Sequence, residues 1–149
     1  MKLAVIAFML LCLNVYVHAL SEALVEELVE KMKLYGLECV EAEKVSPEDL
    51  TALMQRKIPK THEGKCAIFC TAKKLNIIRD DGSFGEGDVE WLAKAKIDDP
   101  NVYNKILETH GKCKTNTADN EDLCEKATRF TFCVFIESKK NGLNKYLPN

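Results

Sequence analysis

The segment Cys66-Ala67-Ile68-Phe69-Cys70 decides how this chain folds. Its two cysteines are at positions i and i+4, which lie one above the other on the same face of a helix. Two thiols stacked in this way cannot bond to each other without distorting the helix. Each must therefore reach a different element, and we expect the framework of cysteines around this segment to define the fold.

The N-terminus has the pattern of a secretory signal peptide. Lys2 gives a basic start, residues 3–17 form an almost continuous apolar run, and residues 17–19 place small side chains where signal peptidase cleaves. We predict a signal peptide over residues 1–19 and one helical domain over residues 20–149. A membrane anchor is the alternative, but the run is short for a bilayer span and acidic helical sequence follows at once. The expected location is therefore extracellular, without membrane insertion.

The cysteine count agrees with export. Cys12 lies in the signal segment, and the domain keeps six cysteines, separated by 26, 3, 42, 10 and 8 residues: Cys39, Cys66, Cys70, Cys113, Cys124 and Cys133. In an exported protein an even set indicates disulfides. Zinc is the competing interpretation, because His62 and His110 are also present. No cysteine pair has the two-residue gap usual in zinc sites, and thiolate sites belong mostly to reducing compartments.

Charge and motifs exclude several functions. The chain has 21 basic and 23 acidic residues, with no long basic run, so nothing suggests a nucleic-acid partner. It has no Gly-x-Ser-x-Gly or His-Glu-x-x-His motif, and disulfide-bonded cysteines leave no thiol nucleophile. We expect no enzyme activity, no cofactor and no metal. The chain also has no Asn-x-Ser/Thr site for N-glycosylation.

Helical periodicity dominates the domain, and no β-strand pattern competes with it. We expect Ser21 and Thr61 to cap helices, Ser46 and Asp49 to form a capping box, and Gly36 to end or bend the first helix. The fold class is predicted to be all-α, with about six helices. The expected helical segments are residues 21–36, 46–58, 62–76, 88–97, 101–112 and 122–139.

The last of these helices should be central. Cys124 and Cys133 are nine residues apart, two and a half turns, so they point to opposite sides and each is tethered to a different neighbour. Residues 127–135 are also too apolar for a surface helix. Residues 79–88, in contrast, are loop-like and resemble a calcium loop at a glance. The fifth ligand position falls on Phe84 or Gly85 and the twelfth lacks glutamate, so we interpret this stretch as a turn.

The cysteine pattern resembles that of the insect odorant-binding proteins of the pheromone-binding and general odorant-binding type. The signal peptide, the three-residue and eight-residue gaps, and residues 75–78, 80–84 and 124–127 all match positions where that family has similar residues. The resemblance implies a fold of about six helices around an internal hydrophobic cavity. The sequence alone cannot supply the disulfide pairing, because six cysteines permit 15 arrangements. The resemblance also implies interlocked disulfides: Cys39–Cys70, Cys66–Cys124 and Cys113–Cys133.

Candidate ligand contacts are apolar residues on the inward faces of several helices, with plain core packing as the alternative for each. Met32 and Met54 are favoured because a flexible thioether suits an adaptable pocket. Trp91 and Thr131 could each offer one hydrogen bond. The full set is Met32, Leu53, Met54, Ile68, Leu75, Ile78, Phe84, Trp91, Leu92, Thr131, Phe135, Tyr146 and Leu147.

The C-terminal tail could close such a cavity. Leu143, Tyr146 and Leu147 are its apolar groups, and a frayed terminus is the alternative. The tail has no histidine and no acidic side chain after Glu137, which argues against an acid-triggered tail insertion. His62 and His110 remain possible pH sensors or ordinary helix residues.

The resemblance implies a secreted carrier that binds small hydrophobic molecules, such as odorants or pheromones, without covalent chemistry. A membrane chemoreceptor would be an indirect partner, and the chain is expected to be a monomer or a weak homodimer. The alternative is a secreted disulfide module that acts through its surface, as an inhibitor or immune effector. Uptake of an apolar probe would separate the two hypotheses.

Overall fold

The structure, a computed structural model, describes residues 19–117 and 122–147. The predicted signal peptide, except for Ala19, lies outside these residues. The described chain consists of helices and one isolated β-bridge, between Ile78 and Phe84, so the all-α prediction is confirmed. No helix in these ranges is both long enough and apolar enough to cross a membrane. The elements are α2 (Glu22–Ala42), α3 (Pro47–Met54), α4 (His62–Lys74), α5 (Val89–Asp98), α6 (Pro100–Asn116), α7 (Leu123–Asn141) and the 3-10 helix η1 (Leu143–Tyr146).

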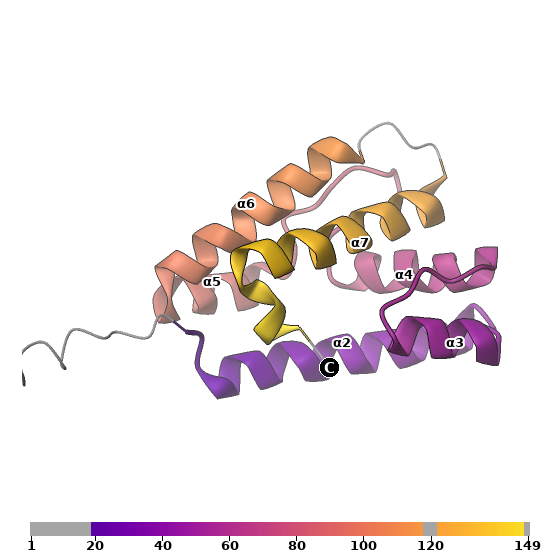
Figure 1. Cartoon of the computed structure of the whole chain (residues 1–149), viewed down its shortest axis with the longest axis horizontal. Helices are drawn as coiled ribbons and strands as arrows, with labels where there is room; N and C mark the ends of the chain where they lie inside the picture. The colour runs from indigo at the N-terminus through magenta and orange to yellow at the C-terminus, as the bar shows by residue number, and fades with distance from the viewer. Residues whose placement is uncertain (1–18, 118–121, 148–149) are drawn as a thin grey trace, which may run out of the picture.

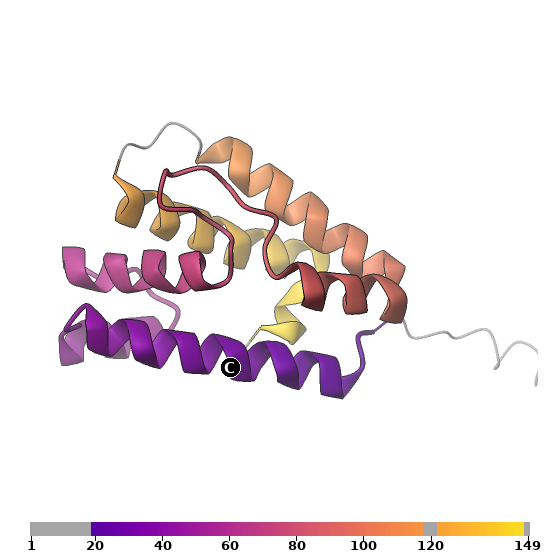
Figure 2. The ribbon, with the colours of Figure 1, turned by 180° about the vertical axis from the view of Figure 1, so that it is seen from behind.

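Helix α7 occupies the middle of the arrangement, as the cysteine spacing predicts. It runs between α4 and α6 and packs against both, while α2 lies along the opposite long edge from α6 (Figures 1 and 2). Helix α2 makes its close helix contacts with α4 and α5 and no comparable contact with α7. The tail after α7 turns back toward α2 in both views.

Local sequence explains where the helices begin. Among the described residues, five of the six α-helices start with a side chain that accepts a hydrogen bond from a backbone N–H two or three residues on, which satisfies an otherwise unpaired donor. Ser21 precedes α2 but makes no such bond; its own N–H donates to Asp98 Oδ2 at 2.6 Å. The five capping residues are Ser46, Thr61, Asp88, Asp99 and Asp122.

The sequence gives weaker signals for the residues at which the helices end. Helices α2, α3 and α4 each end with a left-handed residue that is not glycine: Lys44, Arg56 and Asn76. In each case the next N–H donates to the carbonyl five residues back, which is a Schellman motif. Glycine is the usual residue at this position, and the prediction that Gly36 ends the first helix is wrong. Gly36 lies inside α2, in open space, and α2 continues for another turn and a half. Likewise, α6 extends past its expected end at residue 112 and continues to Asn116.

The predicted capping box at the start of α3 is only half present. Ser46 Oγ accepts from the N–H of Asp49 at 3.2 Å, as expected. The Asp49 carboxylate, however, is turned toward the next helix, where it accepts from Lys60 N at 2.7 Å and from both the N–H and the hydroxyl of Thr61. Asp49 is 2% exposed and thus fastens α3 to the start of α4.

Two separate hydrophobic cores hold the helices together. The first joins the start of α2 to α5, α6 and the tail; its buried members are Leu20, Leu24, Trp91, Ala95, Val102, Leu143 and Tyr146. The second lies among α4, the loop after it, α6 and α7; its buried members are Ala72, Ile78, Cys113, Ala127 and Phe130. The two cores share no residue.

Three disulfides link helices across the molecule. The bonds are Cys39–Cys70, Cys66–Cys124 and Cys113–Cys133, the interlocked arrangement that the family resemblance implies. They tie α2 to α4, α4 to α7, and α6 to α7. Each contributes about 2–4 kcal/mol by restricting the unfolded chain. The stacked thiols of α4 therefore do reach two different helices.

Candidate functional site

A pocket of about 140 Å³ opens where the C-terminal half of α7, the end of α3 and the tail meet. Four of its lining side chains come from α7 at positions i, i+3, i+4 and i+7, which form a single face of the helix. The same helix presents Ala127, Phe130 and Val134 to the second core. One face of α7 therefore packs in the second core, and another face lines the pocket. The complete lining is Arg56, Phe132, Phe135, Ile136, Lys139, Asn144 and Leu147.

Aromatic and aliphatic groups form the floor of this pocket. The rings of Phe132 and Phe135 meet edge to face, with their centroids 5.6 Å apart. Ile136 extends this apolar surface and is 56% exposed. The pocket is therefore an apolar surface that remains accessible to solvent.

The tail forms one wall. Leu143 and Tyr146 are buried in the first core, and the Tyr146 hydroxyl accepts from Leu20 N at 3.2 Å. These contacts hold Leu147 at the pocket edge. The alternative of a frayed terminus is wrong through residue 147, and residues 148–149 lie outside the described chain.

Arg56, which follows the end of α3, is the lining residue that this part of the chain contributes to the pocket. It follows α3 in a left-handed backbone conformation, with φ of 55°. Its guanidinium donates to the carbonyl oxygen of Leu147 at 3.4 Å and lies 5.8 Å from the centre of the Phe135 ring. Arg56 therefore touches both the tail and the floor of the pocket.

The middle of α2 is a second apolar surface near these elements. Its N-terminal part belongs to the first core, and its C-terminal part is fixed to α4 by a disulfide. Between them, Val29, Met32 and Tyr35 are half-buried and belong to neither core. This stretch is therefore a half-buried apolar face that neither core includes.

The structure distributes the thirteen predicted ligand contacts over several environments. Two line the pocket: Phe135 and Leu147. The first core contains Trp91, Leu92 and Tyr146. The second core contains Ile68, Ile78 and Phe84. Leu75 is buried. Three are half-buried outside both cores: Met32, Leu53 and Thr131. Met54 is 76% exposed.

Two of these assignments need correction. Met54 does not face inward, because it is the last residue of a short helix whose close helix contact is with α4 alone among the described elements. Trp91 has no free donor for a ligand, because its indole N–H donates to the carbonyl oxygen of Leu24 at 2.9 Å. Trp91 instead fixes α5 to the start of α2.

Five pocket residues were missed: Arg56, Phe132, Ile136, Lys139 and Asn144. Helical spacing from Phe135 would have found three of them, since Phe132, Ile136 and Lys139 share its face. Arg56 carries no comparable signal. Its place depends on how α3 lies against α7 and the tail, 91 residues further along the chain.

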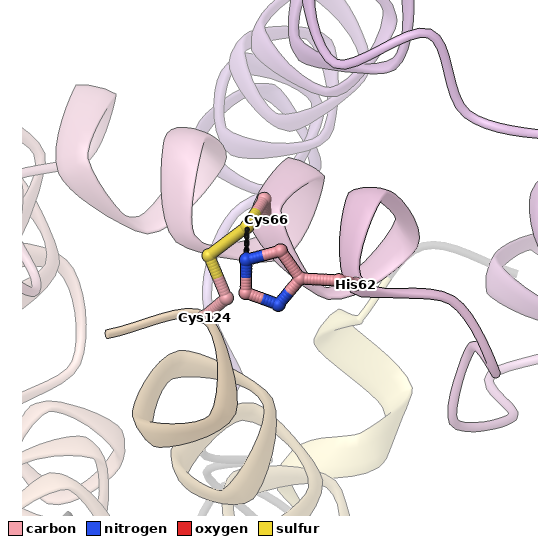
Figure 3. A group of neighbouring side chains, drawn as sticks. All are labelled: His62, Cys66 and Cys124. Atoms are coloured by element: carbon pink, nitrogen blue, oxygen red, sulfur yellow. Dashed lines mark hydrogen bonds between the residues drawn. A yellow bond between two sulfur atoms is a disulfide. The ribbon is translucent and has the colours of Figure 1, made fainter. Parts of the chain in front are cut away.

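His62, Cys66 and Cys124 form a cluster with the spacing of a metal site (Figure 3). The two sulfurs are bonded to each other, so neither is a free thiolate while the disulfide is intact. His62 Nε2 lies 3.3 Å from Cys66 Sγ, and the ring is largely exposed. The cluster is therefore a disulfide with a neighbouring histidine.

His110 is the histidine with a structural role in the interior. Its ring packs edge-on against Phe84 and Phe130, with centroid distances of 6.2 and 5.3 Å. Its Nε2 is buried without a hydrogen-bond partner in the described chain. Burial, and secondarily the charge of Lys114, lower the pKa of His110. The imidazole is thus held in its neutral form beneath the loop of residues 79–88.

Comparisons with known proteins agree with the cysteine pattern. The model of the PBP/GOBP family matches residues 21–137. General odorant-binding protein 28a of Drosophila melanogaster is 30% identical over 131 residues, covering 83% of this chain and 90% of that protein. General odorant-binding protein 19d of the same species is 29% identical over 107 residues, 71% of each chain. The solved structure of odorant-binding protein dmelOBP28a from Drosophila melanogaster superposes with a TM-score of 0.60 at 27% identity, over 80% of this chain and 98% of that one.

Proposed function

Because this chain belongs to the PBP/GOBP family, we propose that it is a secreted, non-covalent carrier of small hydrophobic molecules of the odorant or pheromone type. The family is one of carriers and not of enzymes, and the proposal includes no chemistry on the ligand and no cofactor. Residues 1–19 would direct export, and the domain of residues 20–149 would act in an extracellular fluid such as sensillum lymph. The carrier would deliver its ligand to a membrane chemoreceptor, which would be an indirect partner.

The observation that carries this proposal is the apolar pocket between α7 and the docked tail. An accessible surface of two phenylalanine rings, an isoleucine and a leucine gains free energy when a hydrophobic ligand displaces water from it. A ligand that buries on the order of 200 Å² of apolar surface gains about 5 kcal/mol before the cost of immobilising it. Five kcal/mol corresponds to a Kd of roughly 0.2 mM before that cost. The expected binding is therefore weak and readily reversible, which suits a carrier that must also release its ligand.

The disulfides support the same function. A site left partly unfilled costs stability, because the lining loses packing contacts. The three cross-links join four helices, α2, α4, α6 and α7, and hold their spacing without a filled centre. We expect ligand binding to depend on these bonds.

The test is displacement of a neutral fluorescent apolar probe from the mature oxidised protein. N-phenyl-1-naphthylamine is suitable, because the pocket is open and can take its phenyl ring while the naphthyl group stays outside. We expect saturable uptake that volatile alcohols, esters or acids displace and that reduction of the disulfides abolishes. Phe135→Ala should weaken uptake several-fold, roughly the 1 kcal/mol or more of lost contact area. Ile97→Ala is the matched control, because Ile97 is 85% exposed on α5 and lies outside the pocket lining.

Absence of probe uptake by the correctly bonded protein would contradict the carrier proposal. The surface-acting disulfide module would then be the better hypothesis. Uptake that is unaffected by Phe135→Ala would retain the carrier and place its ligand elsewhere, with the middle of α2 as the next surface to alter.

A further inference from the structure

We propose that the pocket selects anionic amphipathic ligands, small carboxylic acids above all, with Arg56 and Lys139 as the residues that recognise the carboxylate. The inference rests on the proposed carrier function and concerns which ligands it favours. It starts from the composition of the lining, in which two cations stand beside four apolar side chains. None of the described lining residues is acidic.

Neither cation is neutralised within the described chain. Arg56 contacts a neutral carbonyl oxygen and an aromatic ring, and makes no ion pair there. A guanidinium has five N–H donors, so one 3.4 Å bond to the Leu147 carbonyl leaves most of them for a ligand. Its planar fork fits a carboxylate through two parallel hydrogen bonds.

Lys139 is exposed and likewise has no carboxylate partner among the described residues. The acidic side chain nearest to it in sequence on α7 is Glu137, which is already engaged by Lys112 at 2.6 Å and by Lys140 at 2.7 Å. The hydrogen bonds from these lysines, the one from Lys112 having the larger effect, lower the pKa of Glu137, so this carboxylate is already paired with two cations. The positive charge of Lys139 therefore remains directed at the pocket and the solvent.

The size of the pocket limits the apolar part of the ligand. Its volume of about 140 Å³ is close to that of an engineered apolar cavity of about 150 Å³ that accepts benzene. A single ring or a short aliphatic chain would lie on Phe132 and Phe135, with its carboxylate at the cationic rim. Benzoate and hexanoate are acids of this size, and benzyl alcohol and hexanol are their neutral counterparts.

The test compares each acid with its alcohol as a competitor of the neutral probe at pH 7, at low and high salt. We expect the acid to displace the probe at a roughly tenfold lower concentration, since a hydrogen bond to a charged group is worth about 1.5 kcal/mol or more. High salt should reduce this preference, because a solvent-accessible ion pair is screened.

The variants Arg56→Gly and Lys139→Gln should each lower the ratio of acid affinity to alcohol affinity several-fold; the ratio is the readout, because both residues line the pocket and the alcohol also contacts them. Glycine adopts the left-handed conformation of residue 56 without steric conflict, so this variant should fold. Lys44→Gly is the matched control: Lys44 has the same left-handed conformation, with φ of 53°, and the same charge, but lies outside the pocket lining. It should change neither ligand series.

The outcomes separate the two proposals. Probe uptake with equal affinity for acid and alcohol would overturn the anion preference and leave the carrier function standing. A preference for acids that survives both pocket variants would also overturn it, because the recognising cations would then be elsewhere. No probe uptake at all would overturn the carrier function itself.

Discussion

Replacing Asp49 with alanine should reduce the free energy of unfolding by about 4 kcal/mol, because three donors lose a charged acceptor. The carboxylate accepts from Lys60 N at 2.7 Å, from Thr61 N at 2.9 Å and from the Thr61 hydroxyl. It is 2% exposed and connects α3 to the first turn of α4, the helix that carries two of the disulfide cysteines. Replacing Asp49 therefore removes the hydrogen bonds that hold the start of α4 against α3.

The magnitude follows from the partners. A hydrogen bond to a charged group contributes about 1.5–3 kcal/mol when both partners are buried. Lys60 and Thr61 are themselves exposed, so water can reach the freed donors. The lower end of this range therefore applies to each of the three bonds and gives a total of about 4 kcal/mol. Asp49→Asn keeps the size and one acceptor oxygen and should cost about half as much. For a domain of this length, 4 kcal/mol corresponds to a decrease in Tm of roughly 12–16 °C.

The assay is urea denaturation followed by circular dichroism, with the disulfides intact. Glu48→Ala is the matched control, because Glu48 lies in the same first turn of α3 and is exposed; a change of about 0.5 kcal/mol or less is expected. A loss below about 1 kcal/mol for Asp49→Ala would refute the reasoning, since three bonds of ordinary strength could not then depend on this carboxylate.

The same residue should shape the acid limb of the stability curve. Hydrogen bonds from the Thr61 side chain and then from Lys60 N lower the pKa of Asp49. The folded protein therefore binds this proton less readily than the unfolded chain, whose carboxyl titrates near 3.9. The stabilisation is complete above that pH and is lost as the pH falls through the lower folded value. Asp49→Asn should flatten the decline below about pH 4, measured by urea midpoints.

Two further predictions concern the loop of residues 79–88 and its surroundings. Gly85→Ala should destabilise the fold by about 2–3 kcal/mol in the same urea assay, because an added Cβ would lie 2.0 Å from the backbone oxygen of Asn76. Gly111→Ala is the comparison: Gly111 lies in α6 with open space around it, so this change should stabilise the fold by about 0.5–1 kcal/mol. A Gly85→Ala protein as stable as wild type would mean that the loop can move aside. His110→Gln should flatten the pH dependence of stability below about pH 6.5. Burial lowers the pKa of His110 in the folded protein, so its contribution to stability is complete above the pKa of the unfolded chain and is lost as the pH falls toward the pKa of the folded protein. Identical pH profiles of the variant and wild type between pH 7 and pH 5 would contradict this.

The sequence by itself determined the helices and their starting points. Helical periodicity and capping residues such as Ser46 and Thr61 act within one turn, so they can be recognised without knowledge of any distant contact. The cysteine spacing added long-range information, because four positions on α4 and α7 specify directions as well as places in the chain. It correctly placed α7 between two neighbours and indicated the family.

Helix ends and the partners of charged groups were decided by tertiary structure. Arg56 is a left-handed helix end where glycine would be expected, and nothing near it in sequence reveals that it faces Phe135 and Leu147. Asp49 has the sequence context of a local cap, but α4 offers its carboxylate three donors and outcompetes the single bond in its own turn.

The pocket itself belongs to the second category. Its lining combines residue 56 with residues 132–147, and which apolar side chains remain accessible depends on how far each helix is rotated against its neighbours. Trp91 and Ile78 have the same apolar character as Phe135, yet they fill the two cores while Phe135 lines the pocket. Hydrophobicity drives all three out of water, but it has no direction. The packing of α3, α7 and the tail determines which of these side chains is left for a ligand.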